Sequence, residues 1–442
     1  MHFTDEQPYL DAVFDRYADD RPRLVYADFL DDAGEPERAE LVRVQLALAR
    51  IRDDDPRRPA LSERQAELLT QNRAAWTAHL AGLVETVDFR RGIPDAASVN
   101  AETFLARGDE LFRRLRVRRL SLRDVAPVIA KVAASPMLAG VRELDLCNCD
   151  LGRDGLTTLT RSPHLRNLHA LDLGFNALDD ACVELLARSP ALPSLSTLAL
   201  NDNDTIGDAG LAALAASPFF AGLTTLDVSG NDIGDAGITT AVGSPSFARL
   251  RVLRVAGNRV GDAGVAALAR SPLFARMLKA EPKLDLRSNA IGHAGAAVLA
   301  ANRALADCTE LDLSGNYLGD LGVTALLDSP HLGRLRALRL GRNQLTDAGV
   351  AACREPFDRS FNHLRYFDLS GNRLTRVGMG ILTTLRAGRV IQVDVSGNVQ
   401  SAAAGDAPVA VSDVLNGVLD GVTEAVRLKR RIANPRRLTD DA

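Results

Sequence analysis

Residues 223–257 read LTTLDVSGNDIGDAGITTAVGSPSFARLRVLRVAG, and this stretch decides the fold. Leu226 and Val228 stand two positions apart with a polar residue between them, which is typical of a strand. Asp235 then begins a segment whose apolar residues have helical spacing. A second strand pattern begins at Leu250, where the first unit ends. The stretch therefore predicts an architecture built from one repeated strand and helix unit.

The same unit recurs along most of the chain. The position three residues after the second strand leucine is Asn or Cys in every copy, with a mean spacing of about 28 residues: Cys149, Asn176, Asn203, Asn231, Asn258, Asn289, Asn316, Asn343, Asn372 and Asn398. The pattern L-x-x-L-x-L-x-x-N/C resembles leucine-rich repeats, and the spacing with a helical second half resembles the ribonuclease-inhibitor type. Two degenerate units are expected before these, at residues 84–92 and 117–125.

The resemblance implies an α/β solenoid with a parallel concave sheet and convex helices. We expect the asparagines to bond turning backbone groups, and we expect an aspartate to cap the helix that it begins. The glycine two residues later is expected to allow close approach of adjacent helices. The longest unit, between Asn258 and Asn289, is expected to form a surface bulge at residues 277–282, with Glu281 in a slot that leucine fills elsewhere.

Residues 1–82 have the spacing of about four helices rather than of repeats. The segment PRLVYADFLDDAGEPERAELVRVQLAL, residues 22–48, resembles a repeat-companion domain that precedes repeat arrays in planctomycete bacteria. That resemblance implies a bacterial protein and no catalytic activity. The domains predicted are therefore a helical module at 1–82, a solenoid of about 10–12 repeats at 83–408, and a capping helix with a basic tail at 409–442.

Strand alternation turns one column of side chains outward onto the concave face. We predict a protein or peptide site there, with seven aspartates that favour a basic partner and with Tyr366 as an aromatic anchor. Aspartate is also common at this position of the repeat, so a purely solvated column is the alternative. The predicted site residues are Asp145, Asp172, Asp227, Arg254, Asp285, Asp312, Arg339, Tyr366, Asp368 and Asp394.

Composition and cysteine content favour a cytoplasmic protein without cofactors. The formal net charge is −4, which gives no general attraction to nucleic acid or to an anionic membrane. The N-terminal residues lack the pattern of a signal peptide. Five cysteines, an odd number, fit a reducing compartment. Cys147 and Cys149 lack a second ligand pair, so no metal site is predicted, and Cys147 is expected to be the exposed cysteine.

The sequence lacks the local motifs of phosphate loops, nucleophile elbows and zinc proteases, so we predict a non-enzymatic interaction scaffold. The alternative is a GTPase-activating protein, because arrays of this size resemble the Ran GTPase activator; Arg254 or the arginines of residues 113–119 would then act on a partner's phosphate. A structural array without a ligand is a third hypothesis. The basic clusters at 113–119 and 427–437 are interpreted as solvated surface, and nucleic acid is not the expected partner.

Overall fold

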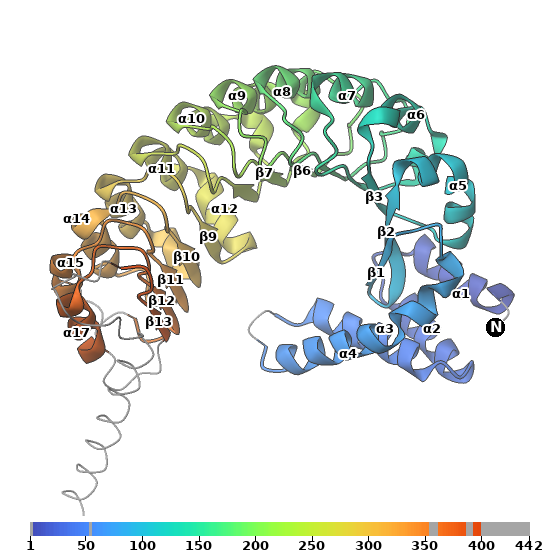
Figure 1. Cartoon of the computed structure of the whole chain (residues 1–442), viewed down its shortest axis with the longest axis horizontal. Coiled ribbons are helices and arrows are strands. Elements are labelled where there is room, and N and C mark those ends of the chain that lie inside the picture. Colours follow the sequence, from blue (N-terminus) through green and yellow to red (C-terminus); the bar gives the residue numbers. More distant parts are fainter. Residues whose placement is uncertain (1–2, 53–54, 353–360, 386–391, 399–442) are drawn as a thin grey trace, which may run out of the picture. The chain divides into compact units, whose positions relative to one another are not determined.

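The structure is a computed structural model that describes residues 3–52, 55–352, 361–385 and 392–398. These residues form two compact units. The first contains the described residues up to 203 and residues 217–223, and the second contains residues 204–216 and the described residues from 224 onward. From β2 onward the strands pair in parallel, and within each unit the repeat helices lie in a row along one side of the strands (Figure 1).

The first unit begins with a helical module, followed by a β-hairpin and the first repeats. Its helices are α1 (Phe3–Asp15), α2 (Arg21–Asp32), α3 (Pro36–Arg50), α4 (Arg58–Thr77), α5 (Ala101–Arg114), α6 (Ile129–Ala133), α7 (Gly152–Leu159) and α8 (Asp180–Ala187). Its strands are β1 (Thr86–Arg90), β2 (Ile93–Asn100), β3 (Arg119–Arg123), β4 (Glu143–Asp145), β5 (Ala170–Asp172) and β6 (Thr197–Ala199).

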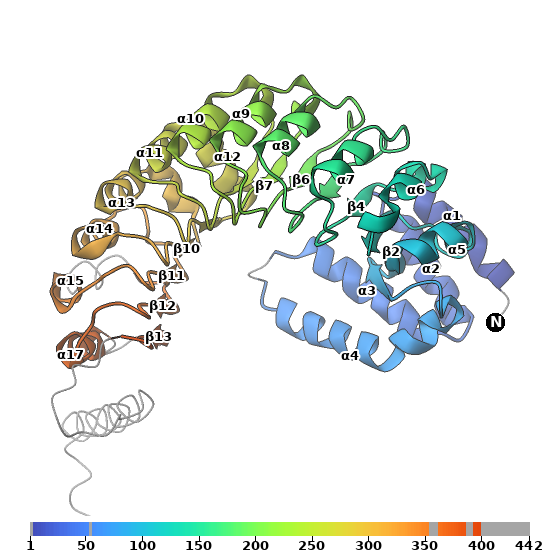
Figure 2. The same cartoon turned by 45° about the horizontal axis from the view of Figure 1, so that its top comes forward.

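The second unit continues the repeats. Its helices are α9 (Asp208–Ala216), α10 (Asp235–Gly243), α11 (Asp262–Arg270), α12 (Pro272–Ala280), α13 (His293–Ala300), α14 (Gly319–Leu327), α15 (Asp347–Ala352) and α17 (Arg376–Leu385). Its strands are β7 (Thr225–Asp227), β8 (Val252–Arg254), β9 (Lys283–Asp285), β10 (Glu310–Asp312), β11 (Ala337–Arg339), β12 (Tyr366–Asp368) and β13 (Gln392–Asp394). Figure 2 shows α10, α11, α13 and α14 side by side.

Strand register confirms the predicted parallel sheet, because equivalent residues of successive repeats pair directly. Leu311 of β10 pairs with Leu284 of β9 and with Leu338 of β11. All three leucines are buried. The apolar position after each helix is also buried, at Leu165, Leu192, Phe220, Phe247, Phe274, Leu305, Leu332 and Phe361.

The asparagines form the predicted ladder. Asn316 Nδ2 donates to the carbonyls of Leu286 and Leu313 at 3.0 and 2.9 Å, and its Oδ1 accepts the Ile291 N–H at 3.0 Å. The Asn316 amide thereby satisfies backbone groups of its own repeat and of the preceding one, where they would otherwise be buried without a partner.

The prediction that each aspartate caps its own helix is wrong for the central repeats. Helix α10 has no side-chain cap from its own cap residue, Gly234, and Asp235 Oδ1 accepts the N–H groups of Gly261 and Gly264 at 2.6 and 2.8 Å, at the start of α11. Adjacent helices lie close enough for the carboxylate to reach the next unit. The same relation links Asp208 to Gly234, Asp262 to Gly292, Asp320 to Thr346 and Asp347 to Thr375.

The residues before the regular repeats differ from the two degenerate units that we expected. Strand β1 pairs antiparallel with β2, so residues 84–92 form the first strand and the turn of a hairpin. Strand β2 pairs in parallel with β3. Gly92 has a φ of +85°, and a Cβ there would lie 2.4 Å from the Val42 Cα. A glycine is therefore required for helix α3 to pack on the hairpin turn.

The longest repeat holds a helix where a surface bulge was predicted. Helix α12 buries Met277 and Leu278, whose exposed fractions are 8% and 2%. Their helical spacing with Leu273 and Phe274 places all four on one buried face. A second sheet, of strands β9 to β13, begins directly after α12.

The predicted capping helix and basic tail, at 409–442, lie outside the described residues, as does Cys353. The predicted boundaries at 82 and 408 stay predictions. Among the described helices, none combines the length and the apolar composition needed to cross a membrane.

Candidate functional site

The outward aspartates of the strands all have a structural role that the sequence analysis missed. In each of the seven, Oδ1 accepts the backbone N–H two residues later at 2.8 to 3.1 Å, which forms a turn that ends the strand. These residues are Asp145, Asp172, Asp227, Asp285, Asp312, Asp368 and Asp394. The sequence signal for this turn was an aspartate at the end of each strand, two residues before the residue whose N–H it accepts. The same aspartate turn therefore recurs along the chain, whether or not the column binds a partner.

We call the outward side chains of β9 to β13 the strand face of the second unit. Asp312, Asp368 and Asp394 form no ion pair with the described residues, and each is half-buried. The Arg339 guanidinium lies 5.2 Å from the centre of the Tyr366 ring and 3.6 Å from Glu310. Partial desolvation and the charges of Asp368 and Asp394 raise the pKa of Tyr366. This part of the strand face is therefore acidic.

The arginines proposed for catalysis on a partner's phosphate are engaged within the chain. Arg254 forms two contacts with the Glu281 carboxylate, at 2.9 and 3.0 Å. The cluster at residues 113–119 also has internal partners: Arg113 with the Asp109 carbonyl, Arg114 with Glu110, Arg116 with Asp11, Arg118 over the Tyr17 ring, and Arg119 with the buried Asp95. Arg113, Arg114 and Arg116 are exposed, which agrees with the interpretation as solvated surface, whereas Arg118 and Arg119 are half-buried. Arg116 and Arg118 thereby hold the helical module to the residues that precede β3.

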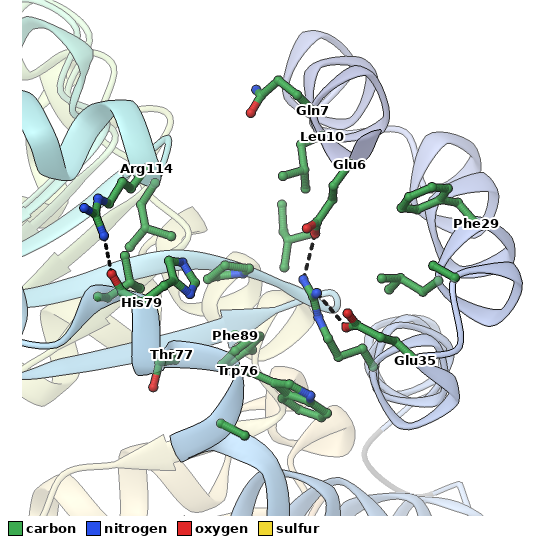
Figure 3. A pocket seen from close by; sticks show the side chains of 18 of the residues that line it. Glu6, Gln7, Leu10, Phe29, Glu35, Trp76, Thr77, His79, Phe89 and Arg114 are labelled. Atoms are coloured by element: carbon green, nitrogen blue, oxygen red, sulfur yellow. Dashed lines mark hydrogen bonds and ion pairs between the residues drawn. The ribbon is translucent and has the colours of Figure 1, made fainter. Parts of the chain in front are cut away.

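The helical module and the hairpin enclose a cavity of about 710 Å³, which we call the N-terminal cavity. Its lining comes from α1, the corner between α2 and α3, the end of α4, both hairpin strands and the end of α5. Figure 3 shows Glu6 and Glu35 on either side of a guanidinium, with Trp76 and Phe89 nearby. Sequence periodicity gave no signal for this cavity, because its walls are far apart in the chain.

A buried polar network forms one wall of the N-terminal cavity. Arg38 bonds Glu6 and Glu35, each at 2.7 Å, and its Nη2 lies 2.8 Å from the Tyr26 hydroxyl. Tyr26 also donates to Glu6. Burial raises the pKa of Tyr26 well above its ordinary value, so this hydroxyl stays a donor. On the opposite side, burial and the charges of Arg114 and Arg38 lower the pKa of His79.

The four described cysteines are distributed as predicted. Cys147 is half-exposed, whereas Cys149, Cys182 and Cys308 are buried. Within the described residues, ligand atoms of Asp145, Cys147 and Asp172 lie within 4.8 Å of one another. One oxygen of each carboxylate is used in a strand turn. Burial and both aspartates raise the pKa of Cys147, which disfavours the thiolate that a metal requires.

Comparison with known proteins identifies the repeats. A leucine-rich repeat family model matches residues 164–187, 191–215, 223–240, 250–269, 309–327, 335–352 and 362–380. No match is found among curated proteins.

Similar solved structures include an internalin from Listeria monocytogenes, with 16% identity, coverage of 69% of this chain and 82% of that one, and a TM-score of 0.37. A chain of the mouse RP105/MD-1 complex has 15% identity, with coverage of 70% of this chain and 51% of that one, and a TM-score of 0.38. A chain of the yeast Rad7 and Elc1 complex has 16% identity, with coverage of 86% of this chain and 92% of that one, and a TM-score of 0.37. The repeated match of the family model, together with the parallel strand ladder and its asparagines, identifies the fold of this chain as a leucine-rich repeat solenoid.

Proposed function

We propose that this protein is a non-enzymatic scaffold that binds a protein partner through the strand face of its repeats. Leucine-rich repeat proteins in general mediate protein interactions, which supports a protein as the partner. The observation that carries the proposal is the use of the aspartates. Each uses one carboxylate oxygen to accept the hydrogen bond of its turn, and Asp312, Asp368 and Asp394 have no ion-pair partner among the described residues.

The charge of this surface favours a basic partner. Strand pairing places Asp368 directly beside Asp394, at the spacing of about 4.8 Å between neighbouring strands. The neighbouring Arg339 is already engaged by Glu310 and Tyr366. A lysine or arginine of a partner would therefore meet uncompensated carboxylates, with Tyr366 as a rigid aromatic anchor. The other predicted site residues, Asp145, Asp172, Asp227, Arg254 and Asp285, stay predictions.

Finer features of the proposal rest on the sequence pattern. We propose that the repeats are of the ribonuclease-inhibitor type, that the helical module is of the repeat-companion kind, and that the protein is bacterial and cytoplasmic. The burial of the free thiols of Cys149, Cys182 and Cys308 is compatible with a reducing compartment. The engagement of Arg254 by Glu281 disfavours the alternative of a GTPase-activating protein.

The test must remove charge without breaking the strand turns. The triple variant Asp312→Asn, Asp368→Asn and Asp394→Asn keeps an oxygen that accepts the turn N–H, whereas lysine would not. The matched control changes three carboxylates away from the strand face: Glu184→Gln, Asp307→Asn and Asp328→Asn.

Partners would be isolated with the full chain from lysate of its source organism, and their affinity would then be measured with purified components by calorimetry. We expect the strand-face variant to weaken binding about tenfold or more, with a reduced dependence on salt, and the control to bind like wild type. Equal affinity of all three proteins for every partner would rule out this surface.

A further inference from the structure

Apolar side chains that are only partly buried line the N-terminal cavity. Six large apolar residues from different elements line it and stay only partly buried: Leu10, Phe14, Phe29, Trp76, Phe89 and Pro94. The volume of about 710 Å³ lies within the range of ligand-binding cavities, roughly 300 to 1,000 Å³. Exposed apolar surface gathered in a concave site is typical of binding sites.

The walls of the cavity are held in place without a ligand. Trp76 packs edge-on against Phe89 with ring centres 5.8 Å apart, and Phe29 stacks on Tyr9 at 4.3 Å. The Arg38 network fixes α1 to the start of α3. Because these contacts keep the cavity open, a ligand would not have to order its walls on binding.

The polar groups inside the cavity leave little for a small polar ligand to bind. Arg38, Glu6, Glu35 and Tyr26 bond one another. A polar metabolite would lose its bonds to water without finding replacements, which costs free energy. An apolar side chain has no such requirement, so the interior favours an apolar anchor.

Unpaired charge lies at the edge of the cavity, at the corner between α2 and α3. Asp32 and Glu37 are exposed and form no ion pair with the described residues. Together with the network, this wall carries four carboxylates, of Glu6, Asp32, Glu35 and Glu37, and one guanidinium. Across the cavity, Arg114 is paired with Glu110 and Arg116 with Asp11, whereas Arg113 bonds the Asp109 carbonyl. The uncompensated charge at the edge is therefore negative on the α2–α3 side.

We propose that the N-terminal cavity is a second binding site, which takes an apolar or aromatic side chain of a partner peptide with a lysine or arginine beside it. The anchor side chain enters between Trp76 and Phe29, and the basic residue contacts Asp32 and Glu37. The site exists because the helical module packs on the hairpin, which gives the module a function in recognition. It is independent of the strand face of the second unit.

The protein contains a built-in probe, since Trp76 is its single tryptophan. A random peptide library displayed on phage would be panned against the full chain. Enriched sequences would be synthesised without tryptophan and titrated while the emission of Trp76 is recorded. We expect enriched peptides to share an apolar residue next to Lys or Arg and to shift the Trp76 emission on binding.

Two pairs of variants test the site. Ala75→Leu fills the cavity, and Ala74→Leu adds the same group at an exposed neighbouring position of α4 that does not line it. Asp32→Asn with Glu37→Gln removes the edge charge, and Asp15→Asn with Glu63→Gln removes equal charge from exposed positions elsewhere in the module.

We expect Ala75→Leu to weaken binding about tenfold and the edge variant to weaken it about fivefold, with both controls unchanged. The strand-face variant should bind these peptides like wild type, so failure of one site is distinguishable from failure of the other. The proposal is overturned if panning enriches no peptide, if the peptides lack a basic residue, or if Ala75→Leu binds them as tightly as Ala74→Leu.

Discussion

Asp262 and Gly295 lie in consecutive repeats, and the Asp262 Oδ1 accepts the Gly295 backbone N–H at 2.8 Å. The same oxygen accepts the Gly292 N–H at 2.7 Å. A Cβ on Gly295 would lie 2.6 Å from this oxygen. The carboxylate of one repeat therefore caps the helix of the next, and the glycine makes room for it.

Gly295→Ala should destabilise the second unit. Alanine in place of a helical glycine normally stabilises by roughly 1 kcal/mol, but here the added methyl would displace the Asp262 carboxylate, and overpacking costs about 1–3 kcal/mol. Gly243→Ala in α10 is the control, since its Cβ would meet no atom within 4 Å. The midpoint of thermal unfolding should fall for Gly295→Ala alone; equal midpoints would contradict the contact.

Asn316→Ala should be among the most destabilising single changes in the repeats. Three hydrogen bonds of 2.9 to 3.0 Å and a longer one of 3.4 Å to the Ser314 carbonyl are lost, and buried backbone groups of two repeats are left without partners. At about 1 kcal/mol for each bond, the expected loss is about 3 kcal/mol. Asn167→Ala, at an exposed position with one bond to the Ala139 carbonyl, serves as the control and should lose under about 1 kcal/mol. Denaturant unfolding followed by circular dichroism measures both losses.

The cap of helix α8 should make part of the stability depend on pH. Asp179 Oδ1 accepts the Cys182 N–H at 2.8 Å, and the hydrogen bonds from Cys182 lower the pKa of Asp179. Its contribution is therefore present above the unfolded-state pKa of about 3.9 and is lost as the pH falls through the lower folded-state pKa.

Asp179→Ala should cost about 1 kcal/mol at pH 7, and the difference from wild type should shrink as the pH falls below about 4. The comparison is made by thermal unfolding at several pH values. Asp179→Asn keeps an acceptor for the cap, so its loss at pH 7 should be smaller and should also shrink as the pH falls, because only the wild-type side chain titrates. A difference for Asp179→Ala that stays constant down to pH 3 would show that the charge does not strengthen the cap.

Cys147 should be the first of the described cysteines to be alkylated, although slowly. Burial raises the pKa of Cys308 to about 12 and that of Cys149 to about 11, and both side chains are shielded. Cys147 is half-exposed, but its raised pKa leaves little thiolate at pH 7.4.

Asp172→Asn should speed the modification of Cys147, because it removes a neighbouring negative charge and keeps the strand turn. The rate would be followed with iodoacetamide by peptide mass spectrometry, which resolves each cysteine. Asp227→Asn, in the corresponding turn of another repeat, is the control. If the two variants react at the same rate, the charge of Asp172 does not govern this thiol.

Much of the fold follows from short-range pattern. The strand pair of Leu311 and Leu313, the asparagine after it and the helix that follows recur within each unit, so the parallel ladder and its buried leucines could be predicted. Helix α12 could not, because its apolar spacing spans only two turns beside a regular helix. The outward direction of Asp312 was predictable from strand alternation, but its turn bond was recognised only in the structure.

The sequence by itself determined the repeat, its period and its inward residues, because hydrophobic alternation and helical spacing are local properties of a chain. Only the tertiary structure decided which charges meet. Asp235 caps a helix 26 residues further on, Arg116 pairs with Asp11, and the N-terminal cavity joins α1, α4 and the hairpin. Such partners meet because the packing of helices and strands brings distant segments within hydrogen-bonding distance. The spacing of residues along the chain does not reveal which segments will come that close.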